Sequence, residues 1–374
     1  MDKLEKMKLL ALAAQYDLCA ACGTQASRVR DDIGRWLFPA VLPNGKTVSL
    51  LKVLQSNACE NDCFYCASRR SRNGQRMTFA PEELAWSFDQ LATSGRAQGL
   101  FLSSAVCHNA SRTMEAMIAT VELVRLRYGF QGYIHLKLLP GCEEATVERA
   151  VQLADRVSVN LEAPNPPRLK RLSADKRFAQ DLMQPMQYAK RFRAQGLGAK
   201  AGLTTQFVVG AAGESDEEIL RTVEGLYGQV NLTRAYFSAF QPVPDTPLEH
   251  HRPTPPLREH RLYQSDFLFR YYGFAFDDLA FDESGTLFAD ADPKTIWAQR
   301  HPEYFPIEVN RASREQLLHV PGIGPQSVKR ILRMRREGKV RSMEDLRTIG
   351  AVTQRAAPFI LLNGRRPPQQ LALW

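Results

Sequence analysis

Short apolar runs alternate with amphipathic stretches over residues 49–239 of this 374-residue chain. Apolar residues at helical spacing predict helices in most of the gaps between the runs, among them 81–93, 113–127 and 143–154. The runs themselves predict strands at 49–55, 99–103, 132–138, 156–162, 203–209 and 234–240. Six repeated strand–helix units predict an α/β fold in which helices cover a parallel sheet, and their number suits a partial (β/α)6 barrel.

Residues 1–48 precede this pattern and predict a helical segment followed by a hairpin. The hairpin would join the apolar runs 36–42 and 47–55 around Asn44-Gly45, a dipeptide that adopts the positive φ angles of a tight turn. The first residues carry too few apolar side chains for a signal peptide. No run in the chain approaches the roughly 20 apolar residues that span a bilayer, so we expect no membrane insertion.

A connector and a separate final unit are predicted after the sheet. Six prolines between Gln241 and His260 interrupt the strand–helix pattern. Eight aromatic residues follow between Tyr263 and Phe281. Such side chains can stack on unpaired bases, but their near-helical spacing is more typical of core packing. The sequence therefore divides into residues 1–48, 49–240, 241–305 and 306–374.

The charge of the chain is concentrated in its last part. The net charge is +9, and residues 306–374 hold 13 Lys and Arg against 5 Asp and Glu, which leaves +1 on residues 1–305. A basic final unit favours a polyanionic partner such as nucleic acid, the alternative being a solvated, arginine-rich helical surface. Seven cysteines that cluster along the chain disfavour a secreted disulfide framework and predict a reducing, cytoplasmic location.

Three cysteines carry the most specific chemical signal. Cys59, Cys63 and Cys66 stand in the string CENDCFYC, directly after the strand that ends near Gln55. Three thiolates on one short loop bind soft metals, and zinc or an iron–sulfur cluster are the usual occupants. A structural zinc site needs a fourth ligand, and no nearby Cys or His completes a typical pattern. A cubane cluster held at three corners instead leaves one iron open.

This loop resembles the signature of the radical S-adenosylmethionine (SAM) superfamily, in which an aromatic residue, here Tyr65, precedes the last cysteine. The resemblance implies a radical SAM barrel, a 4Fe-4S cluster on the three cysteines, SAM bound at the open iron, and hydrogen abstraction by a 5′-deoxyadenosyl radical. The positions that it implies for the cofactor, besides Tyr65, are Ser103, Ser104, Asn160, Glu162, Gly210 and Gly213. Ser103-Ser104-Ala105 departs from the family's Gly-Gly-Glu-like turn, because it lacks the carboxylate.

Four of these positions also have a purely structural interpretation. Asn160 and Glu162 can form a polar strand end, and Gly210 and Gly213 a strand–turn–helix junction. Other candidates are less specific. Cys19 and Cys22 form half of a second metal site, which Cys107 and Cys142 could complete. His135 and Lys137 alternate on one predicted strand, where a substrate role and a buried, hydrogen-bonded role are both open.

The final unit contains a hairpin between two predicted helices. Ser313 and Gln316 form a capping box, the turn Pro321-Gly322-Ile323-Gly324 follows, and Pro325 suits the first position of the next helix. This pattern resembles the helix-hairpin-helix motif of DNA repair and DNA uptake proteins. The resemblance implies a small all-α domain whose hairpin, Gly322 to Gly324, presents N–H groups to phosphates. Lys329, Arg330 and Arg333 would add positive charge.

Residues 342–360 look like a second copy whose turn, Ile349-Gly350-Ala351-Val352, lacks the second glycine. We expect this copy to complete the core and to grip phosphate poorly. The alternative for the whole unit is a protein-docking or packing domain. The combined architecture resembles a family of DNA modification or repair radical SAM proteins. It predicts an enzyme that acts on DNA and takes electrons from a donor such as flavodoxin or ferredoxin. The alternatives are an RNA-modifying radical SAM enzyme and a non-catalytic nucleic-acid-binding protein with a structural cluster.

Overall fold

The computed structural model describes residues 3–14, 37–41 and 47–367. The chain forms two compact units. The first, here the barrel unit, contains residues 1–214 and 225–259; the second, the C-terminal unit, contains residues 215–224 and 260–374. The finer division into four parts, which the sequence predicts, is not tested by these two units and stays a prediction.

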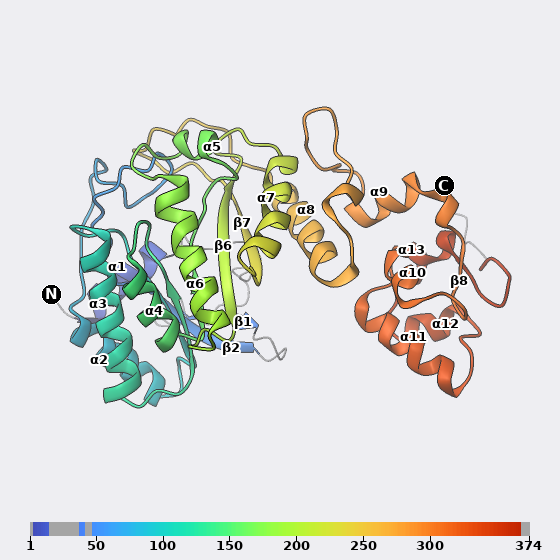
Figure 1. Ribbon diagram of the computed structural model, residues 1–374, viewed down its shortest axis with the longest axis horizontal. Coiled ribbons are helices and arrows are strands. Elements are labelled where there is room, and N and C mark those ends of the chain that lie inside the picture. Colours follow the sequence, from blue (N-terminus) through green and yellow to red (C-terminus); the bar gives the residue numbers. More distant parts are fainter. Residues whose placement is uncertain (1–2, 15–36, 42–46, 368–374) are drawn as a thin grey trace. The chain divides into compact units, whose positions relative to one another are not determined.

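A seven-stranded sheet forms the centre of the barrel unit and curls into a half-barrel (Figure 1). Its strands lie in sequence order from β1 to β7. They are β1 (Leu37–Val41), β2 (Thr47–Leu54), β3 (Gly99–Ser103), β4 (Tyr133–Lys137), β5 (Arg156–Ser158), β6 (Gly202–Val209) and β7 (Arg234–Ala239). β1 pairs antiparallel with β2, and every later neighbour is parallel. The parallel α/β sheet predicted from the alternating pattern is therefore confirmed.

Helices cover the outer face of this sheet, where α2, α3, α4 and α6 lie side by side (Figure 1). The helices are α1 (Lys3–Ala13), α2 (Pro81–Thr93), α3 (Ala110–Glu122), α4 (Glu144–Leu153), α5 (Pro166–Lys170) and α6 (Gln184–Ala194), with π-helical turns at Leu123–Arg127 and Phe178–Met183. α7 (Asp216–Gln229) and α8 (Pro256–Phe267) are divided between the two units. Within the sheet, the neighbouring strands leave little room at Gly99, where a Cβ atom would lie 2.4 Å from Leu50 Cδ2 of β2 and 2.8 Å from the carbonyl oxygen of Tyr133 of β4.

One predicted strand is shorter than its apolar run. Regular pairing in the segment expected at 156–162 ends at Ser158, and Glu162 meets Phe207 only as an isolated bridge. The Leu161 N–H donates to the Thr205 hydroxyl (3.2 Å) instead of to a ladder carbonyl. Glu162 then has a φ of 65°, a left-handed conformation that is rare outside glycine. The chain therefore leaves the ladder where its polar side chains reach the end of the sheet.

The C-terminal unit is built from short helices around a core of its own. Its regular elements are α9 (Pro293–Arg300), β8 (Ile307–Glu308), α10 (Arg314–His319), α11 (Pro325–Glu337), α12 (Met343–Thr348), α13 (Thr353–Ala356) and β9 (Ile360–Leu361). Tighter or wider turns occupy Leu268–Tyr272, Phe276–Asp278, Pro302–Tyr304 and Ala357–Phe359. Leu346, Ile349 and Ala356 of the second helix–turn copy are buried in this core, as predicted. Within the described ranges, no helix is both long and apolar enough to cross a membrane.

Candidate functional site

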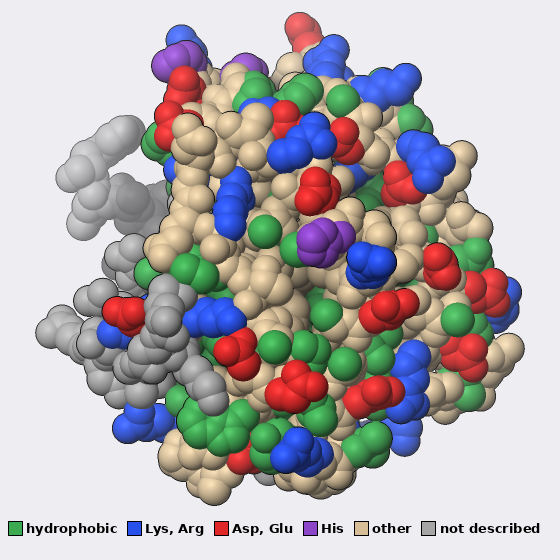
Figure 2. Space-filling view, turned by 90° about the vertical axis from the view of Figure 1, so that its left-hand side faces the viewer, with side chains coloured by type: hydrophobic (Ala, Val, Ile, Leu, Met, Phe, Trp, Pro, Cys, Tyr) green, Lys and Arg blue, Asp and Glu red, His purple; other side chains and the backbone are tan. Residues whose placement is uncertain are grey.

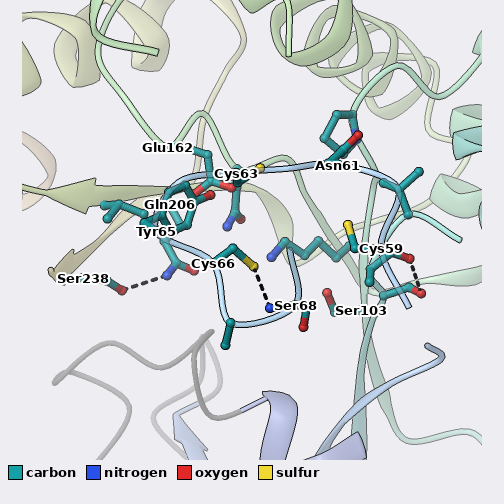
Figure 3. Close-up of a pocket in the computed structure, with 18 of the residues that line it drawn as sticks. Cys59, Asn61, Cys63, Tyr65, Cys66, Ser68, Ser103, Glu162, Gln206 and Ser238 are labelled. Carbon is teal, nitrogen blue, oxygen red and sulfur yellow. Dashed lines mark hydrogen bonds between the residues drawn. The ribbon is translucent and has the colours of Figure 1, made fainter. Parts of the chain in front are cut away.

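A cavity of about 290 Å³ opens at the carboxyl ends of the parallel strands, and the three cysteines line it (Figure 3). Strand-end residues from β3, β4 and β7 contribute Ser103, Lys137 and Ala239. In parallel α/β folds this edge is where ligands bind, because the loops that follow successive strands converge there. The cavity therefore gathers the three sequence-predicted cysteines at the edge of the sheet suited to chemistry.

The protein that surrounds this loop disfavours the thiolate forms of Cys59 and Cys66. Burial raises the pKa of Cys59, and burial together with the neighbouring Cys63 raises the pKa of Cys66 to about 12. The Ser68 N–H donates to the Cys66 sulfur at 3.4 Å, and the Cys63 thiol donates to the Ser173 hydroxyl at 3.6 Å. Of the five described cysteines, none is in a disulfide. Bound iron would favour the thiolate forms, since a cation offsets the cost of burying their charge.

The spacing of these thiols suits a group larger than a single ion. Across the part of the chain that the structure describes, no three Cys, His, Asp or Glu side chains gather tightly enough to hold one metal ion. The three sulfurs instead face a shared cavity, as Figure 3 shows for Cys59, Cys63 and Cys66. Soft sulfur ligands around an open volume fit an iron–sulfur cluster, which cysteine thiolates bind at separate irons.

Arg76 closes the loop that carries the cysteines. Its guanidinium donates to the carbonyl oxygens of Asn57 (2.7 Å) and Ser68 (2.9 Å). It also donates to those of Arg69 (2.6 Å) and Arg72 (2.7 Å). One planar cation thus joins the backbone before Cys59 to the backbone after Cys66.

Asp62 fixes the middle of the same loop. Its carboxylate accepts hydrogen bonds from Arg69 Nε (2.7 Å) and from the Ser71 hydroxyl (2.7 Å), and the Arg69 contact lowers the pKa of Asp62. The Asp62 N–H donates to the Asp175 carboxylate at 2.6 Å. The backbone between the cysteines is therefore held by the protein's own side chains.

A buried ion pair forms the wall of the cavity beside Tyr65. Glu162 Oε1 and Lys176 Nζ lie 3.3 Å apart, and both side chains are buried. Although burial opposes the charge of Lys176, Cys63 and Glu162 raise its pKa. Burial, followed by the carboxylate of Glu162, raises the pKa of Tyr65, which keeps the phenol protonated. The wall therefore presents a phenol, a carboxylate and an ammonium within reach of the cysteines.

The other cofactor positions predicted from the sequence divide into two groups. Ser103, Ser104 and Asn160 line the cavity with the cysteines. The Ser104 hydroxyl donates to the adjacent Ala105 carbonyl oxygen at 2.7 Å, so its outward capacity is that of an acceptor. Gly210 and Gly213 do not belong to this lining.

The turn that holds these two glycines is closed from within. The Glu214 carboxylate accepts the N–H groups of Gly210 and Ala212. A Cβ atom at Gly210, whose φ is 92°, would lie 2.0 Å from the Thr254 hydroxyl oxygen. Glycine at this position is thus required by close packing around the strand–turn–helix junction.

The remaining candidates of the barrel unit are also placed. Lys137 lines the cavity, whereas His135 is buried and shares a 2.9 Å hydrogen bond with the Ser158 hydroxyl. Burial lowers the pKa of His135, which keeps its ring neutral. Cys142 is buried and Cys107 is half-buried. Cys19 and Cys22 lie outside the described residues.

Several polar residues of the cavity were not predicted from the sequence, among them Gln206, Ser238 and Lys176. Gln206 and Ser238, from the adjacent strands β6 and β7, join their side chains in a 2.7 Å hydrogen bond (Figure 3). Each is a polar residue beside a phenylalanine (Phe207 or Phe237) within a predicted strand, which was a usable signal. Lys176 stands in an irregular segment after α5, where no periodicity distinguishes it from the other surface-type charges.

The hairpin of the C-terminal unit joins α10 to α11. The capping box is present, with the Gln316 N–H donating to the Ser313 hydroxyl at 3.2 Å. Gly322 has a φ of 80°, and a Cβ atom there would lie 2.4 Å from the Val352 carbonyl oxygen. Gly324 is the N-cap of α11 and has an extended φ of −104°. Of the two glycines, only Gly322 has a backbone angle that favours glycine. The sequence predicted the same conformational requirement for Gly322 and Gly324, and for Gly324 this is wrong.

The charged residues predicted beside this hairpin have different surroundings. Lys329 and Arg333 are exposed on α11. Arg330 donates a 3.0 Å hydrogen bond to the Ile349 carbonyl oxygen of the second turn. The Ile323 side chain is buried in the core of the unit, so this residue can offer a ligand only its backbone.

The aromatic residues between Tyr263 and Phe281 mostly pack within the C-terminal unit. Phe274 contacts Trp297 of α9 and His319 of α10, with ring centroids 5.4 and 4.5 Å apart. Phe267 and Tyr271 are the exceptions, with 44% and 48% of their surface exposed. Over the face of the barrel unit shown in Figure 2, Lys and Arg are interspersed with Asp and Glu.

Comparison with known families gives one match, to a model described as "Helix-hairpin-helix motif", over residues 305–357. The predicted motif is therefore confirmed in this segment. No curated protein matches the chain by sequence.

Several solved structures are similar to part of this chain at low sequence identity. Methylornithine synthase (PylB) is 14% identical over 86% of this chain and 73% of its own, with a TM-score of 0.49. The FeFe-hydrogenase maturase HydG from Carboxydothermus hydrogenoformans is 12% identical over 59% and 50%, with a TM-score of 0.44. The radical S-adenosylmethionine methyltransferase TsrM from Kitasatospora setae is 13% identical over 54% and 36%, with a TM-score of 0.41. This chain spans half or less of the last two.

Proposed function

We propose that this chain is a radical SAM enzyme that acts on DNA, in repair or in base modification. The observation that carries the proposal is the placement of Cys59, Cys63 and Cys66 around one cavity at the carboxyl edge of a parallel half-barrel. A helix-hairpin-helix segment in the same chain supports the choice of nucleic acid as substrate. When bound, a 4Fe-4S cluster supplies the electron that cleaves SAM and yields the 5′-deoxyadenosyl radical.

The residues of this chain would bind the cluster and orient SAM. The three thiols hold the cluster, and Arg76 keeps their loop closed. Ser103, Asn160 and Glu162 offer hydroxyl, amide and carboxylate groups to the polar parts of SAM, with Tyr65 packed against the wall. The buried Lys176 balances the charge of Glu162, so that the wall stays closed to water.

DNA would be held through its phosphates. The first turn of a helix leaves N–H groups without partners inside the helix, and at α11 these belong to Gly324, Gln326 and Ser327. Lys329 and Arg333 add exposed positive charge on the next turns. Arg330 contributes charge while its guanidinium also supports the second turn. Contacts of this kind position a protein on DNA without reading its sequence.

The first experiment measures cluster binding. Anaerobically reconstituted protein is expected to bind about four iron and four sulfide per chain, as a thiolate-ligated cubane does. Replacing Cys59, Cys63 and Cys66 together by Ala should abolish this iron, while Cys107→Ala, a half-buried cysteine outside the cavity lining, should retain it. A triple variant that keeps its full iron content would place the ligands elsewhere and defeat the proposal.

The second experiment measures chemistry and substrate. The reduced protein should release 5′-deoxyadenosine from SAM, and faster with the true substrate, whose binding energy organises the site. Mass spectrometry of nucleosides from cells with and without the protein should show a change in DNA. A change confined to RNA would move the substrate to RNA. Absence of cleavage by a fully loaded, reduced cluster would favour the non-catalytic alternative.

A further inference from the structure

A buried lysine lies directly beneath the hairpin, outside the segment that matches the helix-hairpin-helix model. Lys294 belongs to α9, and only 6% of its surface is exposed. Its Nζ donates a 2.6 Å hydrogen bond to the carbonyl oxygen of Ile323 and lies 4.6 Å from the centroid of the Tyr272 ring. The ammonium therefore contacts the middle peptide of the turn that is expected to bind phosphate.

We propose that α9 is an integral part of the phosphate-binding hairpin and that Lys294 is its positioning residue, aiming the Gly324 N–H outward and placing positive charge behind it. The inference rests on the proposed binding of DNA by this hairpin. The Ile323 carbonyl and the Gly324 N–H belong to one planar trans peptide, in which the two groups point in opposite directions. A donor that holds the carbonyl inward therefore directs the N–H outward, at the N-cap of α11.

Further contacts hold α9 and the turn in register. Asp292, the N-cap of α9, pairs with Arg355 of α13, and Arg355 also donates to the Thr295 hydroxyl at 2.9 Å. From the other side, the Val352 N–H donates to the Gly322 carbonyl oxygen at 2.8 Å. The Gly322 and Ile323 carbonyls at the middle of the turn thus each accept a hydrogen bond from the protein. The orientation of the turn is set before any ligand arrives.

The surroundings of Lys294 make its charge responsive to a bound anion. Burial, partly offset by Asp292, lowers the pKa of Lys294 to about 7. The charged or titratable groups around it are Asp292, Arg355 of α13, the Tyr272 phenol and, across Trp297, His319 of α10. A phosphate at the Gly324 N–H would favour the ammonium form, so binding should take up a proton near neutral pH. Affinity should then fall as the pH rises through about 7.

The test compares variants of the full chain in binding to a short DNA duplex of arbitrary sequence. Lys294→Met removes the donor and the charge at nearly constant volume. Lys294→Gln keeps an N–H donor for the Ile323 carbonyl but removes the charge. Lys200→Met, which changes an exposed lysine of the barrel unit, is the matched control, and Lys329→Ala reports a direct phosphate contact. Affinity is measured across a salt series and from about pH 6 to about pH 8.5, a range that spans the affected proton.

Lys294→Met should weaken binding about tenfold at the low end of this pH range and leave the log–log salt slope unchanged. Lys329→Ala should instead lower the slope by about one. Relative to wild type, both Lys294 variants should lose the fall in affinity at rising pH; the contribution of His319 cancels in this comparison because all the variants retain it. Lys294→Gln should recover part of the affinity, and amide exchange in the hairpin should be faster in Lys294→Met than in the control.

Two results would overturn the inference. Lys294→Met could bind as tightly as Lys200→Met with unchanged hairpin exchange, in which case the contact positions nothing. It could also lower the salt slope by about one, in which case Lys294 touches phosphate directly. Wild-type protein that binds no duplex is a different outcome, because the proposed DNA substrate would then be wrong and this inference would fail with it.

Discussion

Arg76 and Asn57 are joined by a 2.7 Å hydrogen bond from the guanidinium to the backbone carbonyl, two residues before the first cysteine of the loop. The same guanidinium reaches the Arg72 carbonyl, six residues after the last cysteine. Cys59 and Cys66 therefore stand on a loop whose two ends are fixed to one side chain. A planar fork with five donors suits this role, and a lysine cannot reproduce it.

Arg76→Lys is expected to lower the iron and sulfide bound per chain after reconstitution. The substitution keeps the charge but loses most of the hydrogen bonds to backbone carbonyls, at a cost of about 1–3 kcal/mol in stability. Iron and sulfide analysis measures the first effect and urea unfolding the second. Arg70→Lys, at an exposed neighbouring arginine, is the control and should match wild type. Full cluster content in Arg76→Lys would show that the loop closes without this residue.

Removing one charge of the buried Glu162–Lys176 pair should lower the free energy of unfolding more than removing both charges. Glu162→Gln and Lys176→Met each leave a buried charge without its partner, which costs about 3–5 kcal/mol. The double variant should be more stable than the sum of the single losses predicts. Unfolding free energies of all four proteins complete the cycle. Strictly additive losses would mean that the two side chains do not interact. If Glu162 also meets SAM, Glu162→Gln should weaken SAM binding.

The two hairpin glycines should differ in their tolerance of alanine. Gly322→Ala forces a side chain into a positive φ and toward the Val352 carbonyl oxygen, so we expect a loss of about 1–3 kcal/mol. At Gly324 a Cβ atom would meet only the Tyr272 hydroxyl at 3.2 Å, and the backbone angle is ordinary. Gly324→Ala should therefore unfold near the wild-type temperature. Equal losses in thermal unfolding would contradict this asymmetry.

DNA binding should depend steeply on salt and little on sequence. With about two to four phosphate contacts, the slope of log affinity against log salt should be roughly −2 to −4. Titrations of unrelated duplexes at several salt concentrations measure both properties. Strong discrimination between duplexes, or an affinity indifferent to salt, would argue against a phosphate-directed hairpin.

The fold was largely predictable because its information is local and repeated. Apolar runs separated by helical patterns gave the six parallel strands, and α2 has the bounds 81–93 that its pattern predicted. The strand expected at 156–162 ended early because the Leu161 N–H bonds to the Thr205 hydroxyl and Glu162 rejoins β6 only as an isolated bridge. This interruption depends on side-chain chemistry that an apolar pattern does not record.

The candidate site was predictable where residue type and spacing were both informative. Cys59, Cys63 and Cys66 satisfied this condition, and so did the Gly322 turn. Lys176 and Lys294 could not be predicted, because nothing in the sequence distinguishes them from other lysines. Their roles are visible only in the structure, where each is buried against a partner. Arg76 is a similar case, since its partners are backbone carbonyls that have no sequence signature.

The hydrogen bond from the Val352 N–H to the Gly322 carbonyl oxygen has a consequence for evolution and engineering. Through this bond the second helix–turn copy stabilises the turn of the first copy. The two copies are expected to unfold together, as one cooperative block. A chain that stopped after α11 would lose the partner of that carbonyl together with Leu346 and Ile360 of the shared core. Substitutions in the second turn should therefore also destabilise the first turn.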